Sequence, residues 1–160
     1  AHVPTGTMVS IERETFPALI SDGSPLFATV APGYWRDIGT PAAYLKAQSD
    51  ALHGRVALPL AGPAVDPTAS VATDARSEES VVGDGARIEE AASLSGSTVM
   101  AGARVARGAS VERSILGPGS LVGEGASLRD SVLGEGAQVL PGSIAEGSRI
   151  PGPETRLSAG

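Results

Sequence analysis

Four consecutive stretches of 17 residues, VGDGARIEEAASLSGST (82–98), VMAGARVARGASVERSI (99–115), LGPGSLVGEGASLRDSV (116–132) and LGEGAQVLPGSIAEGSR (133–149), align without a gap. Branched aliphatic residues recur in three columns, which lie six, six and five residues apart within a stretch. The columns are Val82, Val99, Leu116 and Leu133; Ile88, Val105, Val122 and Val139; and Leu94, Val111 and Leu128. Self-similarity at a fixed period predicts a repeat architecture before any local propensity is considered.

The spacing of the columns indicates how each repeat is folded. Six-residue steps suit neither a helix of 3.6 residues per turn nor a single alternating strand. They suit a chain that runs straight, turns a corner and runs straight again, so that three sides close one coil. Stacked coils pair as parallel strands about 4.8 Å apart, and small residues between the columns suit the corners. The sequence therefore predicts a mainly β fold, a parallel β-helix of about five coils over residues 65–160.

Composition divides the chain. All five aromatic residues lie before residue 45, whereas the repeat has none. We expect an N-terminal piece of α/β character over 1–54, a proline-punctuated linker over 55–64 and the coil over 65–160. In the N-terminal piece, Ser10 starts a short helix, and 26–31 reads as a strand. A further helix begins at Pro41, behind an N-cap at Thr40, and continues over 42–53.

Charge and residue content narrow the classes of function. The formal net charge is −6 without a basic cluster, so binding to nucleic acid or to an anionic membrane surface is not expected. The chain has no cysteine, which excludes disulfides and thiol catalysis. No apolar run reaches the roughly 20 residues that a membrane-spanning helix needs, and no signal peptide is visible. A cytoplasmic protein is the expectation.

Two motifs before the repeat carry a family resemblance. S-I-E-R-E-T-F-P (10–17) is followed by G-Y-W-R-D-I-G-T-P-A-A-Y-L-K-A (33–47) and then by hexapeptide coils. This order resembles the sugar-1-phosphate nucleotidyltransferases, most closely the mannose-1-phosphate guanylyltransferase type. The resemblance implies a left-handed β-helix and a reaction in which a nucleoside triphosphate and a sugar 1-phosphate give a nucleotide-sugar and pyrophosphate.

The resemblance also implies site residues. Asp37, in the W-x-D-x-G motif, matches a catalytic aspartate that binds Mg²⁺, and Glu12 matches an acidic residue near the substrate. Mg²⁺ is commonly held by one or two carboxylates together with substrate phosphates. Simpler interpretations stay open: Asp37 braces the turn before Gly39, and Glu12 only complements the helix dipole.

The family's glycine-rich phosphate loop is absent from this sequence. We therefore expect the chain to be the C-terminal part of such an enzyme, inactive without an N-terminal catalytic portion. Two alternatives remain. The coil is a non-catalytic module for homo-oligomerisation or regulation, or it is a hexapeptide acyltransferase. The second needs a histidine base in the coil, but His2 and His53 both lie outside it. The serine column, Ser80 to Ser148, then reads as a structural ladder.

Overall fold

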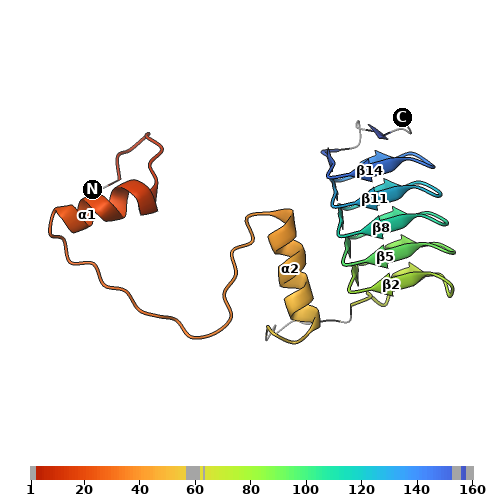
Figure 1. The fold of residues 1–160 in the computed structure, drawn as a ribbon, viewed down its shortest axis with the longest axis horizontal. Coiled ribbons are helices and arrows are strands. Elements are labelled where there is room, and N and C mark those ends of the chain that lie inside the picture. Colours follow the sequence, from red (N-terminus) through yellow and green to blue (C-terminus); the bar gives the residue numbers. More distant parts are fainter. Residues whose placement is uncertain (1–2, 57–61, 63, 153–155, 158–160) are drawn as a thin grey trace. The chain divides into compact units, whose positions relative to one another are not determined.

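The computed structural model describes residues 3–56, 62, 64–152 and 156–157. The chain forms two compact units, Ala1–Gly33 and Tyr34–Gly160. The boundary between these units lies at Gly33, whereas the composition of the sequence changes at 54–64. The predicted domain boundary at 54 therefore stays a prediction. The second unit holds a helix and the coil, which are drawn in orange and in yellow to blue in Figure 1.

The coil consists of three parallel sheets, each with one strand from every coil. The first sheet holds β1 (Ser70–Val71), β4 (Arg87–Ile88), β7 (Arg104–Val105), β10 (Leu121–Val122), β13 (Gln138–Val139) and β16 (Arg156–Leu157). The second holds β2 (Arg76–Glu78), β5 (Ser93–Ser95), β8 (Ser110–Glu112), β11 (Ser127–Arg129) and β14 (Ile144–Glu146). The third holds β3 (Val81–Val82), β6 (Thr98–Val99), β9 (Ile115–Leu116), β12 (Val132–Leu133) and β15 (Arg149–Ile150).

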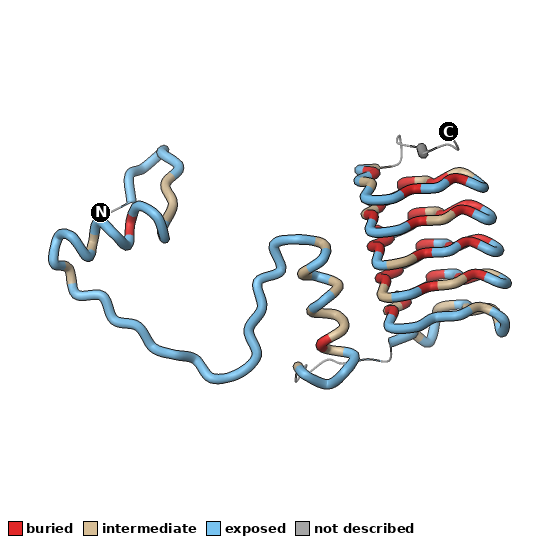
Figure 2. The backbone as a smooth tube through the Cα atoms, in the orientation of Figure 1, coloured by how far each residue is buried: buried red, intermediate tan, exposed pale blue. Residues whose placement is uncertain are grey.

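Strands of neighbouring coils pair residues that are 17 positions apart, which is the period of the repeat. Val99 pairs with Val82 in one neighbouring coil and with Leu116 in the other. All three aliphatic columns point inward and are buried from Val82 onward, and Figure 2 shows this burial as a red lining repeated in the coils that follow the first. The predicted parallel β-helix, its 17-residue period and its number of coils are therefore confirmed. Burial of these columns supplies the main driving force for stacking.

Glycine is required at two kinds of position in the coil. Gly119 turns a corner with φ of +62°, a region that costs other residues energy. Gly123 has a different reason, because a Cβ atom there would lie 2.5 Å from the backbone nitrogen of Pro141 in the next coil. The small residues seen in the sequence thus serve both the corners and the close approach of neighbouring coils.

The serine column is a ladder of satisfied hydroxyl groups, as expected. The Ser97 hydroxyl donates to the Ser95 carbonyl at 2.9 Å and accepts from the Ser114 N–H at 3.1 Å. Ser114 repeats the arrangement toward Ser131, whose N–H lies 3.0 Å from the Ser114 hydroxyl. Each hydroxyl therefore ties one coil to the next, and buried polar groups of this kind need such partners.

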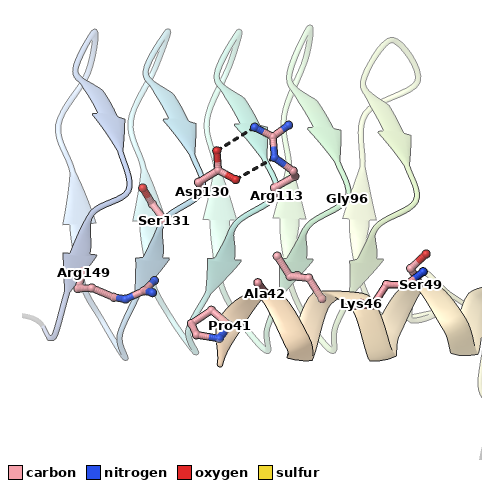
Figure 3. Close-up of a pocket in the computed structure, with 10 residues that line it drawn as sticks. Pro41, Ala42, Lys46, Ser49, Gly96, Arg113, Asp130, Ser131 and Arg149 are labelled. Carbon is pink, nitrogen blue, oxygen red and sulfur yellow. Dashed lines mark hydrogen bonds and ion pairs between the residues drawn. The ribbon is translucent and has the colours of Figure 1, made fainter. Parts of the chain in front are cut away.

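Helix α2 (Pro41–Leu52) forms as the sequence predicts. The Thr40 hydroxyl accepts from the Ala43 N–H at 3.1 Å, and Pro41 fills the first turn. The helix lies against the third sheet, where the Gln48 amide donates to the Ser97 carbonyl at 3.1 Å and accepts from the Thr98 hydroxyl. Figure 3 shows α2 crossing successive strands, so its axis follows the stacking direction.

The first unit contains a π-helical turn, η1 (Ile11–Thr15), and α1 (Phe16–Ser21). The predicted helix start is confirmed, since the Ser10 hydroxyl accepts from the Arg13 N–H at 3.2 Å. The predicted strand over 26–31 is wrong. This segment has no strand assignment and is exposed, because no strand among the described residues pairs with it. Its β-favouring residues alone do not make a strand, which needs a neighbour to satisfy its backbone.

Candidate functional site

The residues 34–38, which include Asp37, are held against α2 by alternate side chains. The Tyr34 hydroxyl donates to Asp50 at 2.9 Å, and the Arg36 guanidinium donates to the same carboxylate at 3.0 Å. Ile38 joins Tyr34 in lining an apolar hollow against α2. In extended backbone, successive side chains point to opposite faces. The alternation therefore assigns Tyr34, Arg36 and Ile38 to the helix side, and Trp35 and Asp37 to the opposite side.

Asp50 is the anchor of this arrangement. Its side chain is 3% exposed, and its carboxylate also contacts Lys46 at 3.2 Å and Arg55 at 2.8 Å. These contacts hold the pKa of Asp50 well below its usual range, with the Arg55 hydrogen bond as the largest cause and with Tyr34 and Lys46 adding to it against the opposing effect of burial. A buried carboxylate is tolerated only when it is paired and hydrogen-bonded in this way.

Asp37 itself is exposed and has no hydrogen bond or ion pair with any described residue. It lies beside Gly39, where an added Cβ would be 3.6 Å from both carboxylate oxygens. The bracing role in the turn is therefore not seen as a hydrogen bond. Trp35 is 84% exposed. The two residues that point away from α2 thus have no partner in the described part of their own chain.

The fit of this site to Mg²⁺ rests on a single carboxylate. Among the described residues, no group of three or more histidine, cysteine, aspartate or glutamate side chains is placed to hold a metal ion. Mg²⁺ prefers six oxygen ligands and often takes only one or two of them from protein carboxylates, with phosphates and water supplying the others. Asp37 therefore fits the role of one ligand and does not form a complete site.

Glu12 lies in η1, in the first unit, whereas Asp37 lies in the second unit. Within η1, the neighbouring Glu14 accepts from the Ser10 N–H at 2.9 Å and completes the cap. Glu12 is exposed and has no hydrogen bond with any described residue. The capping function belongs to Glu14, and the role of Glu12 stays a prediction.

Sequence reasoning missed Asp50. Lys46 stands four residues before it, which indicates a helical ion pair. Its contacts with Tyr34 and Arg36, however, span 16 and 14 residues of chain and could not be read from local spacing. Two residues earlier on α2, Gln48 contacts the coil. Helix α2 therefore connects the 34–38 segment to the coil wall through Asp50 and Gln48.

Charged side chains on the coil surface pair with one another. Arg113 donates to Asp130 through two nitrogens, both at 2.8 Å, and this raises the pKa of Arg113 and lowers that of Asp130. Arg104 pairs with Glu89 in the same manner. Such exposed pairs contribute little to stability, and their arrangement provides no nucleophile with an adjacent base.

Comparison with known proteins identifies the family to which this chain belongs. The family model of the GMPPB C-terminal domain matches residues 61–159, which is more than half of the chain. The chain belongs to the GMPPB C-terminal domain family. A mannose-1-phosphate guanylyltransferase from Mycobacterium tuberculosis is 37% identical over 98 residues, covering 61% of this chain and 24% of that protein. A probable mannose-1-phosphate guanylyltransferase 2 from Oryza sativa is 53% identical over 36 residues, covering 22% of this chain and 10% of that protein.

This member of the family thus spans about a quarter of the length of its mycobacterial relative. Among solved structures, it resembles a GDP-perosamine N-acetyltransferase from Caulobacter crescentus, with 22% identity and a TM-score of 0.41, over 90% of this chain and 68% of that one. The acetyltransferase domain of PglB from Neisseria gonorrhoeae gives 17% identity and a TM-score of 0.29, over 59% of this chain and 53% of that one. Neither likeness assigns an activity. No helix in the described residues is long and apolar enough to cross a membrane.

Proposed function

We propose that this chain is the coil-bearing C-terminal part of a mannose-1-phosphate guanylyltransferase. Such an enzyme joins a nucleoside triphosphate to mannose 1-phosphate and releases pyrophosphate. The observation that carries the proposal is the alternation at 34–38, where Tyr34 and Arg36 are tied to Asp50 while Trp35 and Asp37 are left free. A segment that is fixed on one face and unsatisfied on the other is suited to a site completed by another part of the protein.

The exposed apolar residues before α2 support the same proposal. Phe27 is 94% exposed and Val30 is 92% exposed, in the segment that the sequence predicts to be a strand. Large apolar side chains exposed along one segment mark an interaction surface. In the proposed enzyme, the catalytic portion covers these residues.

Asp37 would be one carboxylate ligand of Mg²⁺ in the complete site, together with phosphates of the nucleotide. The ion, when bound, neutralises charge on the phosphates. The role of this chain is to hold the Asp37 carboxylate at a fixed place, since the backbone on either side of it is anchored through Arg36 and Ile38. Glu12 is proposed near the sugar phosphate. On its own the chain lacks a phosphate-binding loop and is expected to be inactive.

The test combines this chain with a catalytic portion of the family, expressed as one polypeptide, and measures pyrophosphate release from GTP and mannose 1-phosphate. The chain alone should give no turnover, and the joined protein should be active with Mg²⁺. Asp37→Asn should lower kcat/KM by at least about 100-fold, the range of a lost catalytic electrostatic contact. Asp74→Asn, which changes an exposed aspartate on the coil, is the matched control. Normal activity of Asp37→Asn would refute the assignment.

A further inference from the structure

A cavity of about 360 Å³ lies between the N-terminal half of α2 and the coil wall. Figure 3 shows Pro41, Ala42 and Lys46 on the helix side, and Arg113, Asp130, Ser131 and Arg149 on the coil side. We propose that this cavity is a binding site for a small phosphate ester, recognised by Arg149, Lys46 and the first free N–H group of α2. The site is distinct from the face that carries Asp37.

Arg149 is the central group of the proposed site. It lies on β15, at the end of the third sheet, and has no hydrogen bond or ion pair with any described residue. The other arginines at the cavity and at Asp50 are all paired. In Figure 3 the Arg149 guanidinium extends toward Pro41. An arginine left unpaired beside a cavity offers five donors in a planar fork that matches a phosphate group.

Two further donors come from α2. Lys46 lines the cavity and uses one contact, at 3.2 Å, on Asp50, which leaves its other N–H groups available. Asp50 is shared with Arg36 and Arg55, so three cations face one carboxylate. Ala42 also lines the cavity, and its N–H precedes the first N–H that bonds within the helix. These donors add to the positive charge from Arg149.

The carboxylate in the cavity wall does not cancel this charge. Asp130 is held by two nitrogens of Arg113, which lowers the pKa of Asp130 and keeps the pair neutral as a unit. Arg113 also pairs with Glu112, so Arg149 and Lys46 are the remaining cations of the lining, and Lys46 is shared with Asp50. This is a local excess of positive charge on a chain whose formal net charge is −6, and it selects for an anionic ligand.

The shape of the cavity limits the ligand. A volume of about 360 Å³ is at the lower end for small-molecule sites. Pro41, Ala42 and Leu45 add an apolar wall, which suits the carbon face of a sugar ring beside a phosphate group. A monosaccharide phosphate fits this combination of size and charge. All lining residues of the cavity lie within Tyr34–Gly160. The site is therefore independent of the proposed nucleotidyltransferase function.

The experiment is calorimetric titration of the full chain at low ionic strength with a hexose phosphate, with the parent hexose and with inorganic phosphate. We expect saturable binding of the hexose phosphate, weaker binding of inorganic phosphate and none of the hexose. Arg149→Gln should weaken binding at least about tenfold, because a charged hydrogen bond is lost. Lys46→Gln should weaken it less, since its charge is shared with Asp50.

Arg87→Gln is the control, because Arg87 is an exposed coil arginine with no ion pair among the described residues and lies on another sheet. Its affinity should equal that of the unchanged chain. Melting curves for each variant show that the coil is intact. Absence of saturable binding at millimolar ligand, or an equal loss in Arg87→Gln and Arg149→Gln, would overturn the proposal. Binding of inorganic phosphate as tight as that of the hexose phosphate would overturn the sugar-phosphate assignment.

Discussion

Leu116 in the coil is fully buried, whereas Trp35 in the 34–38 segment is 84% exposed. The difference extends to their surroundings. Successive coils from Val82 onward stack aliphatic columns on one another and link their serine hydroxyls, so the coil satisfies itself. The 34–38 segment is satisfied on one face only, by Asp50. The repeat therefore stabilises itself, whereas the 34–38 segment leaves Trp35 and Asp37 exposed.

The largest effect of a substitution is expected in the coil core. Leu116→Ala removes a fully buried side chain whose residue pairs with Val99 and Leu133 in the two neighbouring coils. We expect a loss of about 2–5 kcal/mol in the free energy of unfolding, from lost burial and from the cavity left behind. Thermal and denaturant melts followed by circular dichroism measure it. Ile144→Ala is the control, because Ile144 is 78% exposed, and an equal loss in both variants would contradict the core assignment.

Removal of the Asp50 carboxylate should loosen the 34–38 segment and leave the coil unchanged. Asp50→Asn deletes the charge that holds Tyr34, Arg36 and Arg55. We expect faster amide exchange over 34–38 and a change in Trp35 fluorescence, with little change in the exchange of the coil strands. Glu90→Gln, which alters an exposed acidic residue of the coil, should leave 34–38 unchanged. Protection of 34–38 that survives Asp50→Asn would show that another contact holds the segment.

Acid should release the same segment. The folded-state pKa of Asp50 is lowered, so its contribution to stability is complete above the unfolded pKa of about 3.9 and is lost as the pH falls through the folded value. Trp35 fluorescence should therefore be constant from neutral pH down to about 4 and change only at lower pH. In Asp50→Asn the fluorescence should already have the released value at neutral pH. A transition above pH 5 in the unchanged chain would assign the release to a different group.

The smallest effect is expected on the coil surface. Arg104 pairs with Glu89 in the open, with the arginine side chain 52% exposed. Arg104→Gln should change the free energy of unfolding by less than about 1 kcal/mol. Denaturant melts with and without added salt measure it, and the small difference should vanish at high salt. A larger loss would mean that ion pairs, together with the columns, hold the coils.

The sequence alone predicted the coil in detail, because three aliphatic columns at a constant period permit few other arrangements. It also located α2, since Thr40 and Pro41 are local signals for a helix start. The strand predicted over 26–31 failed because a strand is defined by its neighbour, and propensity at Phe27 and Val30 supplies none. Asp50 was missed because its partners meet only after the chain folds, and the role of Asp37 rests on the family resemblance and stays a prediction.

The docking of α2 along the stacking direction has a geometric consequence. Turns of an α-helix repeat about every 5.4 Å, whereas stacked coils repeat about every 4.8 Å. The two repeats therefore move out of register by about 0.6 Å with each helical turn. Over the 12 residues of α2 the drift reaches about 2 Å. The helix can be in step with the coil at Gln48 and Thr98 but not at both of its ends. A helix one or two turns longer would lie further out of step with the coils, and the two repeats would match again only after about eight helical turns.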